Sequence, residues 1–151
     1  MQVKSTAFQE GAMIPRPYTC DDKYISPSLS WSGGPAETKS IALIMDDPDA
    51  PVGTWVHWVL FNIPPDTTSL AENIPRTGSL PNGSKHGSNS WSNLGYGGPC
   101  PPGGTHRYYF KVYALDCILT LNTGINKAQL LKAMEGHILG EGQLMGRYAR
   151  K

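Results

Sequence analysis

The apolar positions of this chain fall into short runs, and three of these runs have the length and pattern of a β-strand. Residues 40–45 (SIALIM) are nearly continuously apolar, which is typical of a strand covered on both faces. Residues 55–63 (WVHWVLFNI) are rich in aromatic and β-branched side chains. Residues 107–116 (RYYFKVYALD) have a period of two. That period places on one face Tyr108, Phe110, Val112 and Ala114.

Weaker patterns predict three more strands. Residues 3–9 are predicted to form a first strand, and residues 28–33 alternate Leu29 and Trp31 with serines. Residues 142–150 are expected to add a last short strand. Between the strong strands lies a long segment, 66–106, dominated by Gly, Ser, Asn and Pro, and a loop of this length inside a domain is usually functional or disordered.

One α-helix is predicted, over residues 127–139. Asn126 suits the N-cap, Gln129 has the capping-box position, and Gly140 follows the expected end. Apolar residues at helical spacing predict a face that packs on a sheet. These residues are Leu130, Leu131, Met134 and Ile138.

Length and composition favour one β-rich domain, residues 1–151. The 17 glycines and 13 prolines divide the chain into pieces that leave little room for long helices. Three cysteines, Cys20, Cys100 and Cys117, have no C-x-x-C spacing, so they are expected to be free thiols. One bridge between two of them is the alternative.

The charges exclude two classes of partner. With 13 Lys and Arg against 12 Asp and Glu the formal net charge is +1. This charge lacks the basic excess that binding to nucleic acid or to an acidic membrane surface requires. No run approaches the ~18 to 20 apolar residues of a membrane span, and residues 1–15 lack the apolar core of a secretory signal. A cytoplasmic protein without an integral membrane segment is expected.

Two histidines are candidates for binding chemistry. His57 lies in the aromatic strand and should share a face with Trp55, Val59 and Phe61, whereas His106 opens the next strand and shares a face with Tyr108. An isolated strand histidine is more often a core residue than a ligand. The two other histidines lie elsewhere, His86 in the polar loop and His137 near the end of the helix.

Two aspartates strengthen the case for a site. Asp47 and Asp49 lie in Asp-Pro-Asp-Ala-Pro, where the prolines stiffen the turn that carries both carboxylates. The alternative is that they only cap this turn through backbone amides. The glycine-rich segment 95–110, which delivers His106, lets backbone amides approach an anion closely.

Together these motifs resemble the phosphatidylethanolamine-binding protein family, also called the Raf kinase inhibitor protein family. The resemblance spans about residues 8–150 and is closest to the compact bacterial and archaeal branch. The motifs that carry it are Asp47-Pro48-Asp49-Ala50-Pro51, Trp55-x-His57, Gly98-Pro99 and Thr105-His106-Arg107-Tyr108, followed by the ending GHILGEGQLMGRYAR.

The resemblance implies a mainly β fold, a two-sheet antiparallel β-sandwich with Greek-key connections and one or two peripheral helices. It also implies a small pocket for anions such as phosphate-bearing head groups, and a cis bond between Ala50 and Pro51. The residues that it places along the pocket are Asp47, His57, His106 and Tyr108, with a wall formed by Pro51, Trp55, Tyr96, Gly98 and Pro99. Asp49 and Arg107 are implied to support the site structurally.

The leading functional hypothesis is a non-enzymatic binding protein for a small phosphate-containing or other anionic ligand, with no cofactor and no metal. The alternative is a regulatory inhibitor of a kinase or a protease, with that enzyme as its partner. A third hypothesis is hydrolysis or metal chemistry by Asp47, His57 and His106. Homodimers occur among the bacterial members that the chain resembles, so a homodimer is also considered.

Overall fold

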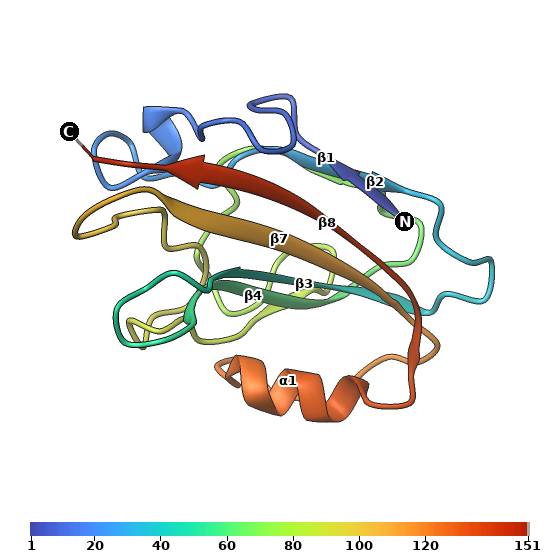
Figure 1. Cartoon of the computed structure of the whole chain (residues 1–151). Helices are drawn as coiled ribbons and strands as arrows, with labels where there is room; N and C mark the ends of the chain where they lie inside the picture. The colour runs from blue at the N-terminus through green and yellow to red at the C-terminus, as the bar shows by residue number, and fades with distance from the viewer. Residues whose placement is uncertain (151) are drawn as a thin grey trace.

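The computed structural model describes residues 1–150, which form two antiparallel sheets and one short α-helix (Figure 1). The strands are β1 Gln2–Lys4, β2 Leu29–Ser32, β3 Ser40–Asp47, β4 Trp55–Ile63, β5 Ser69–Leu70, β6 Lys85–His86, β7 His106–Leu115 and β8 Ile138–Tyr148. The helices are the 3-10 turn η1 Arg16–Tyr18 and α1 Lys127–Met134. The mainly β fold with two antiparallel sheets is therefore confirmed.

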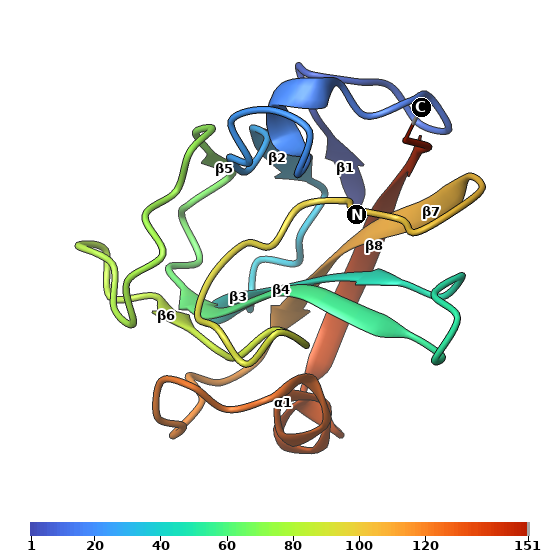
Figure 2. The ribbon, with the colours of Figure 1, turned by 90° about the vertical axis from the view of Figure 1, so that its left-hand side faces the viewer.

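The larger sheet has the order β6-β4-β3-β7-β8, and the smaller has the order β1-β2-β5. Figure 2 shows the smaller sheet on one face of the larger sheet and α1 on the other. Strand β3 lies at the centre of the larger sheet, and all eight of its residues are buried. The continuous apolar run in its sequence follows from this double covering.

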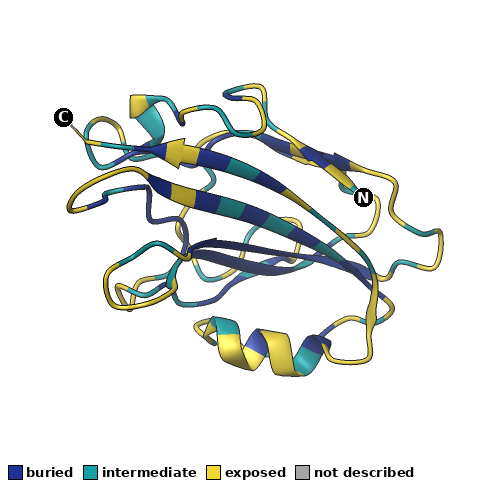
Figure 3. Ribbon diagram, viewed as in Figure 1, coloured by how far each residue is buried: buried dark blue, intermediate teal, exposed yellow. Residues whose placement is uncertain are grey.

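Alternating side chains of the central strands divide the core into two clusters. Leu43, Met45 and Leu60 belong to the cluster between the two sheets, whereas Ile44 and Val59 pack toward α1. On β7 the predicted apolar face is confirmed, since Tyr108, Phe110, Val112 and Ala114 are all buried between the sheets. Figure 3 shows this alternation of burial along the strand.

The predicted helix begins where expected but ends early. Asn126 accepts from the Gln129 amide at 2.9 Å, and the Gln129 side chain accepts from the Asn126 amide at 2.9 Å, so the capping box is confirmed. The helix stops at Met134, because Gly136 takes a positive φ of 77° that reverses the chain. Ile138 therefore starts β8, and the predicted helical end at 139 is wrong.

Two predicted strands also change length. Strand β1 is limited to Gln2–Lys4, shorter than the predicted 3–9, whereas β8 has 11 residues and pairs along all of β7, so it is no short strand. Strand β2 confirms the alternation at 28–33. The long segment 66–106 is mostly irregular and contributes the two-residue strands β5 and β6.

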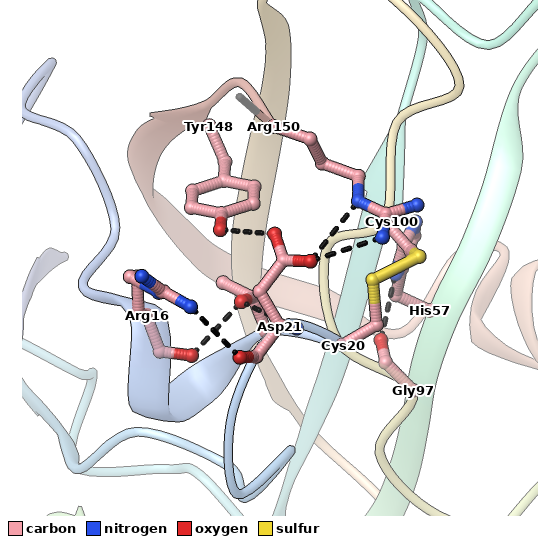
Figure 4. Close-up of a disulfide and its surroundings, with 9 residues drawn as sticks. Arg16, Cys20, Asp21, His57, Gly97, Cys100, Tyr148 and Arg150 are labelled. Carbon is pink, nitrogen blue, oxygen red and sulfur yellow. Dashed lines mark hydrogen bonds and ion pairs between the residues drawn. A yellow bond between two sulfur atoms is a disulfide. The ribbon is translucent and has the colours of Figure 1, made fainter.

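The cysteine prediction is wrong for two of the three residues. Cys20 and Cys100 form a disulfide (Figure 4), and Cys117 is free. The fold brings their two loops together, since the Cys20 amide also donates to the Pro99 carbonyl at 3.1 Å. Because the two cysteines are 80 residues apart in the sequence, local sequence patterns do not indicate that they lie close together.

Two further expectations meet the structure here. No peptide bond among residues 1–150 is cis, so the cis bond expected between Ala50 and Pro51 is wrong. Within the same described residues, no helix has the length and apolarity that a membrane crossing requires.

Candidate functional site

A cavity of about 170 Å³ opens where β3 ends, β4 begins and β7 begins. It is smaller than the ~300–1,000 Å³ of pockets that enclose drug-sized molecules, so it suits one small ligand. The turn between β3 and β4 and the start of β4 supply Asp47, Ala50, Pro51, Val52, Trp55 and His57. Later segments supply Trp91, Cys100, Pro101, Pro102, His106 and Tyr108.

A β-bulge turns His57 toward this cavity. The β3–β4 pairing shifts between Met45 and Asp46: Met45 pairs with Trp58 and Asp46 with Val56, which leaves His57 as the extra residue. The His57 ring therefore packs edge-on against Tyr108, with ring centroids 5.2 Å apart. Its predicted face is wrong in part, because Val59 and Phe61 point toward α1 while Trp55 lines the cavity with His57.

One nitrogen of His57 is committed to the backbone. Nδ1 lies 2.6 Å from the Gly97 carbonyl oxygen, which only accepts, so Nδ1 carries a proton and donates (Figure 4). Burial lowers the pKa of His57 from 6.5 to about 4, against the opposing effects of the Gly97 carbonyl and Asp47. At neutral pH the ring is therefore neutral, and Nε2 is left for a ligand.

His106 is oriented by a carboxylate. Its Nδ1 lies 2.7 Å from Asp47 Oδ2, and both residues are buried. Asp47 Oδ1 accepts from the Asp49 amide at 2.7 Å. Asp47 therefore caps its own turn, as the capping alternative expects, and also holds the His106 ring, whereas its contact with a ligand stays a prediction. His106 Nε2 is left for a ligand.

Asp49 and Arg107 lie outside the cavity lining. The Arg107 guanidinium donates to both oxygens of Asp49 at 2.9 and 2.8 Å, and the Arg107 amide donates to Oδ2 at 2.9 Å. These hydrogen bonds from Arg107 lower the pKa of Asp49 to about 2 despite partial burial. The fork ties the turn after β3 to the start of β7, which keeps Asp47 beside His106.

Two residues that line the cavity carry a buried donor with no hydrogen-bond partner. Among residues 1–150, Tyr108 Oη and Trp55 Nε1 are the only buried side-chain polar atoms in this condition. Burial, followed by the charges of Asp47 and Asp49, raises the pKa of Tyr108 well above its usual range, so the hydroxyl stays protonated. Because buried polar groups normally have partners, these two donors are unusual, and both belong to residues that line the cavity.

Trp91 lines the cavity although the sequence did not identify it. Its ring centroid lies 5.0 Å from that of His57 and 5.6 Å from that of Trp55, both edge-on, and 37% of the residue is exposed. Cys100, Pro101 and Pro102 complete the wall on the disulfide side. The only signal for Trp91 was one aromatic residue inside a polar loop, which has no periodicity to place it.

Three of the predicted wall residues stand behind the cavity and do not line it. Tyr96 is buried, and its hydroxyl donates to the Tyr18 carbonyl at 2.7 Å. Gly98 lies so close to Tyr18 that a Cβ on Gly98 would be 2.4 Å from the Tyr18 carbonyl oxygen. The Pro99 carbonyl accepts a hydrogen bond from the Cys20 amide, so these residues hold the loop before β7 against the η1 region.

The other two histidines lie away from the cavity. His86 has both nitrogens bonded: Nε2 accepts from Trp58 Nε1 at 3.0 Å, and Nδ1 donates to the Thr77 carbonyl at 2.7 Å. Burial lowers the pKa of His86. His137 pairs with Asp116 at 2.7 Å at the far end of β7. His57 and His106 are thus the histidines that the fold brings together.

Comparisons with known proteins agree on one family. The family described as "Phosphatidylethanolamine-binding protein" matches residues 4–149. A UPF0098 protein of Methanothermobacter thermautotrophicus is 57% identical over 150 residues, covering 99% of each chain. A crystal structure of a putative phosphatidylethanolamine-binding protein homologue from Chlamydia trachomatis has a TM-score of 0.92 at 42% identity, covering 99% of this chain and 97% of that one. The structure of Escherichia coli YbcL, titled a new member of the mammalian PEBP family, has a TM-score of 0.92 at 34% identity, covering 99% and 98%.

Proposed function

Because the chain belongs to the phosphatidylethanolamine-binding protein family, we propose that its cavity binds one small phosphate-bearing or similar anionic head group without transforming it. The observation that carries this proposal is the pair of unpartnered buried donors, Tyr108 Oη and Trp55 Nε1. A phosphate oxygen that accepts from either donor would remove the cost of about 1–3 kcal/mol that an unsatisfied buried group carries.

The imidazoles supply the charge that the two neutral donors lack. His57 and His106 each have Nδ1 bonded and Nε2 unused, so both can donate to an anion once Nε2 is protonated. A bound anion raises the pKa of a neighbouring imidazole because it stabilises the charged form. Binding is therefore expected to take up a proton at His57, whose pKa in the ligand-free protein is about 4.

Asp47 restricts the ligands that this cavity accepts. It is the one carboxylate among the lining residues, and a fully ionised phosphate next to it meets repulsion. A ligand that carries its own ammonium group, such as phosphoethanolamine, would offset this charge. A zwitterionic head group is therefore favoured over inorganic phosphate.

Binding is favoured over catalysis by the state of the lining side chains. Asp47 is held by His106 and by the Asp49 amide, and the Cys100 sulfur is in the disulfide. Tyr108 keeps its proton because burial raises its pKa. These groups orient and donate, whereas a covalent mechanism needs an activated nucleophile beside a base.

Histidine NMR tests the proposal directly. Phosphoethanolamine and inorganic phosphate are titrated in turn while the imidazole signals are followed. The signals of His57 and His106 should shift, more strongly with phosphoethanolamine, while His86, whose two nitrogens are bonded, serves as the internal control. Unchanged His57 and His106 signals at millimolar concentrations of both ligands would overturn the proposal.

A matched pair of tyrosine variants separates binding from folding. Tyr108→Phe removes an unpartnered hydroxyl, so the free energy of unfolding should stay constant or rise while the affinity for phosphoethanolamine falls about 3- to 10-fold. Tyr96→Phe removes a hydroxyl that donates to Tyr18, so it should destabilise the fold and leave the affinity unchanged. Equal affinities of Tyr108→Phe and the unmodified protein would contradict the assigned role of the hydroxyl.

A further inference from the structure

A second group of chemically reactive side chains lies at the opposite end of β7 from the cavity. Asp116 and Cys117 directly follow β7, and His137 directly precedes β8. Figure 1 shows these two segments side by side, where β7 leaves the sheet and α1 returns the chain to β8. Among residues 1–150 no hydrogen bond joins this group to Asp47, His57 or His106, so its chemistry is separate from the proposed ligand cavity.

The three side chains already converge. One ligand atom from each of Asp116, Cys117 and His137 lies within 4.8 Å of those of the other two, and this is the one such group of His, Cys, Asp and Glu residues within 1–150. His137 Nδ1 lies 2.7 Å from Asp116 Oδ1. Asp47, His57 and His106, which the sequence offered for metal chemistry, do not form such a group.

The backbone that carries the group is fixed by hydrogen bonds of its own. The Asp116 amide donates to the His137 carbonyl at 3.0 Å, which holds the two segments opposite each other. The Ser40 hydroxyl donates to the Cys117 carbonyl at 2.6 Å, which anchors the third residue to β3. Only side-chain rotations are then needed to organise a site, and this lowers the entropic cost of binding.

We propose that Asp116, Cys117 and His137 bind one divalent transition-metal ion, with zinc as the best fit. A thiolate, an imidazole and a carboxylate are all zinc ligands, and the thiolate disfavours magnesium and calcium, which take oxygen ligands. Three protein ligands leave the fourth tetrahedral position to water.

The required rearrangement is small. Two nitrogen or oxygen ligands of one tetrahedral zinc lie about 3.3 Å apart, so His137 Nδ1 and Asp116 Oδ1 must separate by about 0.6 Å from their 2.7 Å contact. Their side chains are 45% and 40% exposed, which leaves both free to move and gives the ion a path from solvent. A thiolate next to a carboxylate is unfavourable without a cation, and a bound metal deprotonates the thiol outright.

Cobalt(II) titration of the full chain, freed of metal by a chelator, tests this site. Cobalt(II) bound through a thiolate gives a charge-transfer absorption that oxygen and nitrogen ligands do not give. Cys117 is the one free thiol in the described chain, because Cys20 and Cys100 are bonded to each other. The absorption should saturate at one equivalent and disappear when zinc is added.

Variants assign the ligands. Cys117→Ser should abolish the charge-transfer absorption, and Asp116→Asn and His137→Gln should each weaken cobalt binding at least tenfold. Glu135→Gln removes an exposed carboxylate two residues from His137 and should leave binding unchanged. Circular dichroism of each variant confirms that the fold is kept. The proposal is overturned if the intact chain shows no thiolate absorption at micromolar cobalt, or if Asp116→Asn and His137→Gln bind as tightly as the unmodified chain.

Discussion

Protonation of His57 should make the stability of this protein depend on pH in a defined window. Burial lowers the pKa of His57 in the folded protein from 6.5 to about 4. Between these two values the unfolded chain binds a proton at His57 that the folded protein does not bind. The free energy of unfolding is therefore highest above pH 6.5 and falls as the pH decreases toward 4.

The size of this loss follows from the two pKa values. Each pKa unit corresponds to 1.36 kcal/mol, so the difference between 6.5 and about 4 amounts to a loss of about 3 kcal/mol by pH 4. Many domains are stable by only about 5–15 kcal/mol, so a loss of this size is readily measured. Urea unfolding, followed by tryptophan fluorescence across the window, gives the free energy at each pH.

A variant isolates the contribution of this histidine. His57→Asn keeps a side-chain amide near the position of Nδ1 to donate to the Gly97 carbonyl, but it does not titrate. Its free energy of unfolding should be lower overall and should depend less on pH, by about 3 kcal/mol across the window. His86, whose pKa burial also lowers, is present in both proteins and cancels in the difference. Asn126→Ala, which weakens the fold without removing a titratable group, serves as the control and should keep the original slope.

The same measurement connects stability to the proposed ligand. Saturating phosphoethanolamine should flatten the pH dependence of the unmodified protein, because a bound anion raises the pKa of His57 toward its ordinary value. Equal slopes of the unmodified protein and His57→Asn, without ligand, would refute the assignment of a neutral buried imidazole.

Three further changes test the frame around the cavity. Replacing Cys20 and Cys100 by serine opens a loop of 80 residues. The added entropy of the unfolded chain should lower the free energy of unfolding by about 4.5 kcal/mol, which should appear as a lower urea midpoint. A midpoint unchanged from that of the oxidised protein would contradict a disulfide in the folded state. Gly98→Ala should cost about 1–3 kcal/mol, since its Cβ would lie 2.4 Å from the Tyr18 carbonyl oxygen, whereas Gly103→Ala in the same loop meets no atom within 4 Å and should be neutral. Asn126→Ala should lower the thermal midpoint through a loss of about 1 kcal/mol, because it removes the acceptor of the capping box.

The sequence predicted the strands whose patterns are strong and local. Strands β3, β4 and β7 lie within one or two residues of their predicted ranges, because continuous or alternating apolar runs define their burial directly. The helix start was equally local, since the capping box needs only Asn126 and Gln129. The helix end was not, because Ile138 continues the helical spacing by coincidence, beyond the turn at Gly136.

Strand β8 was underestimated because its glycines make it look irregular. They are needed for close approach by the N-terminal segment. A Cβ at Gly142 would lie 2.3 Å from the Met1 carbonyl oxygen, and one at Gly146 would lie 2.6 Å from a side-chain atom of Ile14. The reason for these glycines is therefore a packing partner more than a hundred residues away, which local patterns do not contain.

The residues of the candidate site that belong to short motifs were predictable from the sequence. The residues that tertiary contacts bring to the site were not. Asp47, His57, His106 and Tyr108 come from three short motifs, and the fold places all four along one cavity. The face of His57 was missed because a bulge breaks the period of two. The disulfide and Trp91 were missed because they depend on how irregular loops pack.

The proposed anion site lies beside three carboxylates, those of Asp46, Asp47 and Asp49. Each of them is bonded to a different set of partners. Asp46 points away from the cavity toward α1, where its Oδ2 meets Lys127 Nζ at 2.7 Å and Lys111 Nζ at 3.3 Å. Asp49 is held by the Arg107 guanidinium outside the cavity. Only Asp47 faces the cavity, and its oxygens are engaged by His106 and by the Asp49 amide.

This division follows from strand geometry. Neighbouring residues of β3 point to opposite faces, so Asp46 and Asp47 separate, and the bulge opposite them turns His57 to the face of Asp47. A regular β4 would have left His57 with Val59 and Phe61 on the α1 face, near Asp46 and its lysines. The irregular pairing of β3 and β4 therefore places His57 on the same side as Asp47. The groups without a hydrogen-bond partner on the residues that line the cavity then include two neutral donors, Tyr108 Oη and Trp55 Nε1, and the Nε2 atoms of His57 and His106.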